Sequence, residues 1–359
     1  MTKIEYKDII AFHPGYYLAD IIEELEMTQE EFAKRLNISG KTVSTLLSGQ
    51  SNITNDIAQK LSDMLGINVE TFLELQKKYD EKLIEIERTK SMDSQIEIVK
   101  MIDYNYFIKN AFLPQASSLE EKVKNLKAFF KISDLRLYTE EKFMASFRTT
   151  VSNISVKNIV NSNAWLQTAI YVGADMEVDA FDEKKLKSYL SEIRSMTVKS
   201  PEAFMPRLRE IFKSCGVAFV ILPALKNCGV NGVVKWFDNR VVLAINDRFS
   251  YADAFWFTLF HEIKHVLQKK IKKIIVRGES ENEEYKELEE DANKFASDKL
   301  IPPSDFEKFV KNNFFTNTSI INFAREQNIH PGIVVGRLQH EKIIPHSYFS
   351  DLKEKYKII

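Results

Sequence analysis

The sequence predicts a multidomain protein with an all-α N-terminal bundle, a helical middle region and an α+β C-terminal domain. Short amphipathic helical patterns fill residues 15–75, further helical patterns fill 92–200, and β-branched apolar runs appear only after them. A chain of 359 residues that is 44% hydrophobic can bury the cores of two or three domains. We therefore expect domains at 1–80, 81–200 and 201–359.

Composition and charge exclude several classes of protein. Fifty basic and fifty-one acidic residues give a net charge of −1, so no global field favours nucleic acid or an anionic membrane. No uncharged apolar run reaches the roughly 18 residues of a membrane span, and no signal-peptide core stands near the N-terminus. We expect a cytoplasmic protein with no membrane partner. Cys215 and Cys228 lack the paired spacing of a metal site, and we expect reduced thiols.

The first domain contains two short helices joined by a tight turn. Its stretch "TQEE" predicts a capping box, in which Thr28 accepts a hydrogen bond from the first turn of the helix while Glu31 reaches back. The helix that follows ends near Leu36 and is separated by "NIS" from "GKTVSTLLSG", whose apolar side chains stand at helical spacing among polar ones. This pattern predicts a helix-turn-helix bundle.

The stretch "MTQEEFAKRLNISGKTVSTLLSGQSNITNDIAQKLSDMLG" resembles the XRE-type helix-turn-helix family, and "HPGYYLADIIEELEMTQEEFA" is similar to its HigA-like antitoxin branch. The resemblance implies a regulator that places the helix around Lys41–Ser48 in the major groove of a double-stranded DNA operator. The residues that it assigns to DNA binding are Gln29, Ser39, Lys41, Thr42, Ser44 and Thr45, with Gln29 on backbone phosphate. Because single modules usually read paired half-sites, we expect a homodimer.

The charge of this domain opposes tight DNA binding by a single copy. Residues 1–78 contain eight Lys and Arg against twelve Asp and Glu, whereas phosphate neutralisation supplies most of the affinity. A dimer that gathers Lys34, Arg35, Lys41 and Lys60 on one face would still bind specifically. The alternative is a five-helix module that binds protein instead of DNA.

The middle region carries helical patterns and no catalytic constellation. The charged segment "QKKYDEKLIEIER" favours a continuous connecting helix, and further helical patterns follow it, among them "EEKFMASFRTTV". Trp165, an aromatic at helical spacing, is typical of a core position, and neither it nor Arg148 indicates a site. We interpret this region as a helical spacer or sensor domain.

The C-terminal domain begins with short strands and continues into a helix. The runs "CGVAFVILP", "NGVVKWF" and "NRVVLAIND" are apolar, β-branched and bounded by turn residues. In the helix at Tyr251–Gln268, His261 and His265 stand four residues apart on one face, with Glu262 beside the first, as an HExxH motif. The apolar "FWFTLF" before the motif predicts burial, and buried paired histidines require a specific partner such as a metal.

The spacing of this motif suits a zinc ion. Two neutral imidazoles and one carboxylate make a three-ligand tetrahedral site that leaves a fourth position for water. Zinc lowers the pKa of such a water to about 7, and Glu262 is placed to take its proton as a general base. The third ligand should come from "KELEEDANKFASDKLIPP", where Glu289 opens an ExxAN arrangement that resembles the third-ligand segment of gluzincins. Asp291 and Glu290 are the alternatives to Glu289.

Four segments in order resemble the ImmA/IrrE family of zinc metallopeptidases: "VNGVVKWFDNRVVLAINDR", "FWFTLFHEIKHVLQ", "EEDANKFASDKLIPP" and "IHPGIVVGRLQHEKIIP". The resemblance implies a zincin-like α+β fold, Zn2+ as cofactor and cleavage of a helix-turn-helix repressor. The family usually has Gly where Lys264 stands, Glu or Gln where Asp291 stands, and Met near Ile301. We expect the cation of Lys264 to narrow the cleft or to bind an acidic partner.

Two further features accompany the motif. The basic segment Lys269–Arg277 is typical of a solvated loop, with a lid over the cleft or a partner contact as alternatives. His330, His340 and His346 lie near the C-terminus, and one of them is a candidate to stabilise an oxyanion.

The leading hypothesis is a DNA-binding transcriptional regulator with a zinc-dependent endopeptidase domain that cleaves a partner repressor or antitoxin. One alternative is an antitoxin-like repressor whose zinc site is structural or sensory and cleaves nothing. Another is a peptidase whose N-terminal helices recognise only protein. A structural site would not need a base, so Glu262 favours the enzyme.

Overall fold

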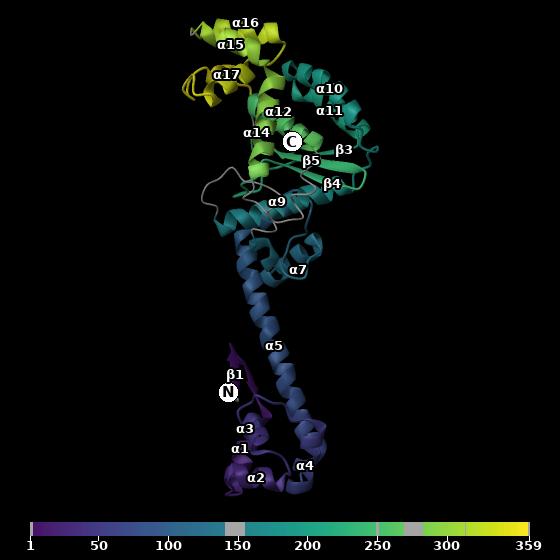
Figure 1. The fold of residues 1–359 in the computed structure, drawn as a ribbon, viewed down its shortest axis with the longest axis vertical. Helices are drawn as coiled ribbons and strands as arrows, with labels where there is room; N and C mark the ends of the chain where they lie inside the picture. The colour runs from purple at the N-terminus through teal and green to yellow at the C-terminus, as the bar shows by residue number, and fades with distance from the viewer. Residues whose placement is uncertain (1–2, 141–154, 249–250, 269–282, 313, 358–359) are drawn as a thin grey trace. The chain divides into compact units, whose positions relative to one another are not determined.

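The computed structural model of the chain describes residues 3–140, 155–248, 251–268, 283–312 and 314–357. The chain divides into two compact units, Met1–Glu97 and Ile98–Ile359 (Figure 1). The first unit is mostly helical, and the second combines helices with a small sheet. The predicted fold class is therefore confirmed: the protein is multidomain, with helices at its N-terminus and in its middle and an α+β part at its C-terminus.

The first unit begins with a two-stranded antiparallel sheet that the sequence pattern does not predict. Strand β1 (Lys3–Tyr6) pairs with β2 (Ile9–Phe12). Residues far along the chain hold this hairpin: the Tyr6 hydroxyl donates to Asp93 Oδ2 at 2.6 Å, and the Lys7 ammonium lies 2.7 Å from the same carboxylate. The hairpin therefore depends on tertiary contacts.

Four short helices follow: α1 (Pro14–Glu24), α2 (Gln29–Arg35), α3 (Gly40–Leu47) and α4 (Asn55–Leu65). The last three begin at hydroxyl caps, because Thr28, Ser39 and Thr54 each accept a hydrogen bond from the backbone N–H three residues on. The capping box expected at Thr28 is half formed, since the Glu31 carboxylate accepts from Arg35 Nη2 at 2.6 Å instead of reaching back. The shared core includes Leu18, Ile22, Phe32, Val43, Leu46, Ile57 and Leu61.

Helix α5 (Val69–Met101) contains the connecting helix that the charged segment predicts, and the boundary between the units falls within it. Its earlier turns belong to the first unit: Gln76 Oε1 accepts from Ile53 N at 2.9 Å, and Asp93 holds the hairpin. The observed division after Glu97 differs from the boundary expected at 80, because these contacts extend the first unit well along the helix.

The second unit is built on a three-stranded sheet with the order β3-β5-β4. Strand β5 (Arg240–Asn246) pairs parallel with β3 (Val217–Leu222) and antiparallel with β4 (Gly232–Phe237). One face of the sheet packs on α9 (Val156–Ala174) and the other on α12 (Ala252–Gln268), as Figure 1 shows. Because both faces are covered, the strands are nearly continuous apolar runs.

The middle helices belong to this second unit. They are α6 (Tyr104–Lys109), α7 (Leu119–Phe130), the 3-10 helix η1 (Leu135–Thr139) and α9. Trp165 of α9 is fully buried and donates from Nε1 to the Pro223 carbonyl at 3.0 Å, which confirms its core position. Since α9 packs directly on β3 and β5, no boundary falls near residue 200. The predicted helix "EEKFMASFRTTV", with Arg148, lies outside the described residues.

Further helices complete the second unit, before and after the strands in the sequence. Before β3 come α10 (Glu183–Ser195), the 3-10 helix η2 (Met196–Val198) and α11 (Pro201–Ser214). After α12 come α14 (Glu283–Leu300), α15 (Pro303–Lys311), α16 (Asn317–Gln327), α17 (Pro331–His340) and the 3-10 helix η3 (Ser350–Leu352). Helix α12 packs against both α14 and α17 and so lies at the centre of this unit.

The last described residues fasten the start of α12. The Tyr356 hydroxyl accepts from Trp256 Nε1 at 3.0 Å, and the Lys353 ammonium lies 2.7 Å from the Asp253 carboxylate. Trp256 is fully buried and Tyr356 is 5% exposed. These contacts therefore anchor the turns of α12 that precede its two histidines in the sequence.

The sequence composition predicts reduced cysteines and no membrane span. Cys215 and Cys228 are buried and free, as the cysteine count predicts. Burial raises the pKa of each thiol, which makes both poor nucleophiles at neutral pH. Within the described ranges, no helix combines the length and the apolar character that crossing a membrane requires.

Candidate functional site

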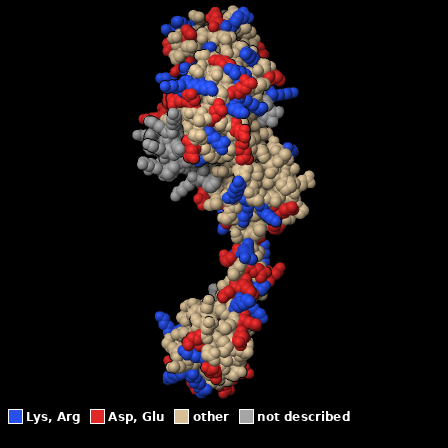
Figure 2. Space-filling model, turned by 90° about the vertical axis from the view of Figure 1, so that its right-hand side faces the viewer, with Lys and Arg blue, Asp and Glu red and all other residues tan. Residues whose placement is uncertain are grey.

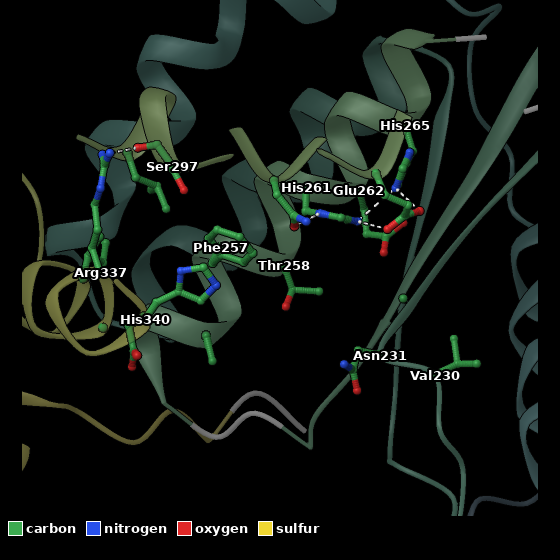
Figure 3. Close-up of a pocket in the computed structure, with 18 of the residues that line it drawn as sticks. Val230, Asn231, Phe257, Thr258, His261, Glu262, His265, Ser297, Arg337 and His340 are labelled. Carbon is green, nitrogen blue, oxygen red and sulfur yellow. Dashed lines mark hydrogen bonds and ion pairs between the residues drawn. The ribbon is translucent and has the colours of Figure 1, made fainter. Parts of the chain in front are cut away.

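Three side chains from two helices converge on one point. His261 and His265 project from α12, and Glu289 projects from α14 toward them. The two histidine Nε2 atoms are 2.9 Å apart (Figure 3). A carboxylate oxygen of Glu289 lies 3.6 Å from the His261 Nε2 and another lies 3.2 Å from the His265 Nε2. The structure thus brings together the three residues that the sequence nominates as metal ligands.

The opposite ring nitrogens are each held by an amide oxygen. His261 Nδ1 lies 2.9 Å from Asn293 Oδ1, and His265 Nδ1 lies 2.9 Å from Gln268 Oε1. An amide oxygen only accepts, so each Nδ1 carries a hydrogen and each Nε2 is the atom left to face the shared point. Two imidazole nitrogens and one carboxylate are the donor set of a catalytic zinc site, and the residues present fit Zn2+.

The alternative third ligands lie elsewhere. The Asp291 carboxylate accepts from Gln268 Nε2 at 3.0 Å and pairs with the Lys264 ammonium at 2.9 Å. Glu290 is exposed on α14. Among the acidic side chains that the structure describes, Glu289 is the one that groups with the two histidines. This placement favours Glu289 over both alternatives.

Burial and neighbouring charges together set the protonation of the two histidines. Burial and, to a smaller extent, the nearby His265 lower the pKa of His261 to about 4. The pKa of His265 is raised, because the hydrogen bond to Glu289 and the charges of Glu262 and Glu289 outweigh the effect of burial. His261 is neutral at pH 7, which is the form that binds a metal.

Glu262 lies in the wall beside the ligands. It is 8% exposed, and burial raises its pKa to about 7 against the opposing charge of His265. Gly232, the first residue of β4, leaves room for it, since a Cβ there would lie 2.6 Å from Glu262 Cδ. A carboxyl group with a pKa near 7 suits general base chemistry. Sequence reasoning misses Gly232, because only the folded sheet brings β4 against α12.

A cavity of about 360 Å3 opens beside the three donors. Asn231 borders it next to β4, and Phe257 and His340 border it on the opposite side (Figure 3). The Asn231 Oδ1 atom is buried and has no hydrogen-bond partner among the described residues. The apolar part of the lining includes Val230, Val233, Val234, Leu300, Ile301 and Ile333. The cavity therefore combines an apolar surface with polar groups, as ligand-binding sites do.

One of the three C-terminal histidines reaches this cavity. His340 lines it from α17, with Phe257 between His340 and His261 (Figure 3). His330 instead caps α17, since its Nδ1 accepts from Gly332 N at 3.0 Å and its Nε2 lies 3.2 Å from Glu354. His346 is exposed.

Lys264 points away from the cavity. Its ammonium pairs with Asp291 and lies 5.3 Å from the centre of the Phe295 ring, and it is not part of the cavity lining. The expectation that Lys264 narrows the cleft is therefore wrong, and its acidic partner is a residue of the same chain. Lys264 and Asp291, at which the sequence differs from the pattern that the resemblance implies, thus pair with each other. The segment Lys269–Arg277, considered above as a loop or lid, lies outside the described residues.

The residues nominated for DNA contact lie at the start of α2, in the following turn and on α3. Three of them bind one another: Ser39 Oγ accepts from Thr42 N at 3.0 Å, and Thr45 Oγ1 donates to the Thr42 carbonyl at 3.0 Å. Thr45 also accepts from Ser51 Oγ at 3.0 Å. These bonds shape the start and the end of α3. The nominated residues with exposed side chains and no part in this group are Gln29, Lys41 and Ser44.

The first unit does not gather positive charge strongly. Arg35 pairs with Glu31 at 2.6 Å, and Lys60 pairs with Asp56 at 2.8 Å. On the faces drawn in Figure 2, basic and acidic side chains are intermixed in both units. This distribution predicts modest DNA affinity for one copy of the unit.

Comparison with known proteins matches one segment of each unit to a family. Residues 18–72 match the family described as Helix-turn-helix, and residues 227–338 match the family described as IrrE N-terminal-like domain. An HTH-type transcriptional regulator of Escherichia coli (strain K12), YddM, itself uncharacterized, is 30% identical over 86 residues. That match covers 23% of this chain and 92% of the regulator.

Two solved structures are similar over an equal share. One is a putative antidote protein of a plasmid maintenance system from Nostoc punctiforme, at 32% identity and a TM-score of 0.23. The other is an addiction module antidote protein of a HigA family from Coxiella burnetii, at 33% identity and a TM-score of 0.22. Each match covers 23% of this chain and 92% of the other. From the family matches and the regulator that it nearly spans, the chain belongs to the helix-turn-helix transcriptional regulators and joins to that module an ImmA/IrrE-like domain.

Proposed function

We propose that this regulator carries a zinc-dependent endopeptidase in its second unit and cleaves a repressor or antitoxin of the helix-turn-helix class in the cytoplasm. The observation that carries the proposal is the convergence of His261, His265 and Glu289 beside a cavity whose wall holds the buried Glu262. Structural zinc sites are closed by four protein ligands, whereas catalytic sites have three and keep one position open. Three donors that face a cavity fit the second kind.

In the proposed reaction, the chain's own residues transfer protons and exclude water from the site. Zinc, when bound, lowers the pKa of water and polarises a carbonyl oxygen. Glu262 takes a proton from the attacking water as the water oxygen bonds to the carbonyl carbon of the scissile peptide. It then delivers that proton to the leaving nitrogen as the C–N bond breaks. The apolar lining holds the peptide and limits the entry of other water.

Metal content and cleavage, measured together, test this proposal. The full chain and the variants His261→Ala, Glu289→Ala and Glu262→Gln are analysed for zinc by mass spectrometry and incubated with the protein encoded by the adjacent gene. We expect about one zinc per chain in the wild type and in Glu262→Gln, none in the two ligand variants, and cleavage by the wild type alone. Absence of zinc from the wild type contradicts the proposal.

The same measurement separates the rival role for the second unit. Stoichiometric zinc without cleavage of any helix-turn-helix partner would favour an antitoxin-like repressor whose zinc site is structural or sensory. The similarity to antidote proteins is the observation that keeps this candidate in view. That similarity covers 23% of the chain and so bears only on the first unit. A structural or sensory zinc site would leave Glu262 without a role.

For the first unit we propose that a homodimer binds a double-stranded DNA operator with α3 in the major groove. The exposed side chains of Lys41 and Ser44 on α3 and the match to helix-turn-helix regulators support this. The test is binding of the full chain to DNA from its own promoter at several salt concentrations. We expect the logarithm of the affinity to fall linearly with that of the salt concentration. Failure to bind that DNA at low salt would favour a module that recognises protein.

A further inference from the structure

A chain of polar contacts lies behind His265, on the side away from the cavity. It runs from Lys264 through Asp291 and Gln268 to the His265 ring, and it crosses twice between α12 and α14. We propose that this relay fixes the ring of His265 in the metal-binding tautomer and orientation, with Gln268 as the positioning residue, and so sets the zinc affinity. The inference rests on the zinc site proposed above.

The orientation of the Gln268 amide follows from its neighbours. Gln268 Nε2 donates to the Leu288 carbonyl at 2.9 Å and to Asp291 Oδ2 at 3.0 Å. Both partners are acceptors, so a flipped amide would place its oxygen against two oxygens. The amide nitrogen is therefore fixed on this side, and Oε1 must face the His265 ring.

The tautomer of His265 follows from the orientation of that amide. Oε1 of Gln268 lies 2.9 Å from His265 Nδ1 and can only accept, so Nδ1 must carry a hydrogen. Nε2, the atom that faces Glu289 at 3.2 Å, is then the ring nitrogen that is free to bind a metal. Such outer contacts orient a ligand and raise its basicity.

The relay also links the positions of two ligands. The backbone carbonyl that accepts the hydrogen bond from Gln268 belongs to Leu288, the residue next to Glu289. Leu288 is 8% exposed. A single amide thereby contacts the ring of one ligand and the backbone beside another. Loss of Gln268 should loosen α12 from α14 at the metal-facing turn.

Lys264 orients the carboxylate in the middle of the relay. Its ammonium and the Gln268 amide both contact Asp291 Oδ2, from positions one turn apart on α12. The Lys264 side chain is 23% exposed and the Asp291 side chain is 50% exposed. Solvent screens this pair, so we expect its effect on affinity to be smaller than that of Gln268.

The test measures zinc affinity of the full-length protein by competition with a chelator of known affinity, with no activity readout. We expect Gln268→Leu to weaken zinc binding by about 10- to 100-fold, as losses of outer-shell partners do. Asp291→Asn and Lys264→Met should each weaken it by about two- to fivefold. Glu290→Gln, which makes the same charge change as Asp291→Asn at an exposed neighbouring position, should leave it unchanged.

Two further measurements separate positioning from general stability. A merely structural role would lower the unfolding temperature of the chelated protein and leave the visible absorption bands of the cobalt-loaded form unchanged. The relay predicts altered cobalt bands in Gln268→Leu, because the geometry at the metal changes. If Gln268→Leu does not fold, Asp291→Asn against Glu290→Gln carries the test.

The outcomes are distinct. Wild-type zinc affinity in the folded variants overturns the relay and leaves the zinc site standing. Equal losses in Asp291→Asn and Glu290→Gln also overturn it, because they indicate a general charge effect. A wild type that binds no zinc overturns both the zinc site and the relay.

Discussion

The buried carboxyl of Glu262 has a consequence for stability. Its pKa is raised to about 7 in the folded protein from an ordinary value of 4.5. The folded state therefore holds a proton that the unfolded state releases, and the free energy of unfolding falls as pH rises from about 4.5 to about 7. We predict that Glu262→Gln stabilises the metal-free protein by at most about 3 kcal/mol above pH 7 and changes little below pH 4.

Thermal or denaturant unfolding of both proteins in a chelator, at pH 4 and pH 8, checks this prediction. The stabilisation should be larger at pH 8. A gain that is equal at both pH values would contradict the assignment of the raised pKa to Glu262.

Gly232 offers a second prediction for a single residue. A methyl group at this position would overlap the carboxyl of Glu262, so Gly232→Ala must displace the proposed base without touching a ligand. We predict a fall in cleavage rate of about 100-fold with zinc content unchanged. Gly40→Ala is a suitable control, because a Cβ at Gly40 meets nothing within 4 Å. Cleavage at the wild-type rate by Gly232→Ala would remove Glu262 from the proposed role.

Sequence reasoning finds residues whose spacing is local and misses those joined by tertiary contacts. His261, Glu262 and His265 lie within one helical turn, so their pattern is visible in the sequence. The part played by Gln268 depends on the register of α14 against α12, which no spacing in the sequence reveals. Lys264 is another example, since the ion pair with Asp291 on α14 decides where its side chain points.

At the scale of single elements, α3 carries polar residues that are free to contact a ligand and polar residues that bond within the helix. Lys41 is exposed, whereas Thr45 is half-buried and bonded to the Thr42 carbonyl. We predict that Lys41→Ala weakens operator binding and reduces the slope of log affinity against log salt by about 1. Electrophoretic or anisotropy titrations at several salt concentrations measure that slope.

The matched variant at α3 is Thr45→Ser, which keeps the hydroxyl that bonds within the helix. It should bind DNA with the wild-type salt slope, because Thr45 supplies no charge. An unchanged slope for Lys41→Ala would indicate that α3 does not lie against phosphate.

The hairpin of β1 and β2 is the element that the sequence pattern does not predict. Its strands have four residues each, and the connecting Lys7 takes a positive φ of 52° that usually favours Asn or Gly. Asp93 offsets these weak local signals by binding both Tyr6 and Lys7. By contrast, the three strands of the second unit consist mostly of apolar residues, so their positions are predicted well.

At the scale of the whole molecule, the two units have separate cores. Among the described residues, the group of side chains that could hold a metal lies in the second unit, while the hydrophobic core of the helix-turn-helix lies wholly in the first. We predict that heating the full chain gives two unfolding transitions, of which zinc raises only one. A ligand at 100 times its dissociation constant stabilises the state that binds it by about 2.7 kcal/mol.

Differential scanning calorimetry with zinc and with a chelator checks this prediction, with His261→Ala as the control that should show no shift. A shift of both transitions would mean that the units unfold together. The sequence predicts separate cores. Its domain boundaries lie at other residues than the division between the two units, because that division depends on the tertiary contacts of α5 and α9.

The fastening of α12 by the last described residues implies an order of events during synthesis. Trp256 acquires its partner only when Tyr356 has been made, a hundred residues later. Domains made first generally fold first, so the DNA-binding module would fold on the ribosome while the helix that carries HExxH still lacks its anchor. In a nascent chain of this regulator, the helix-turn-helix module would thus be folded before the proposed peptidase site is complete.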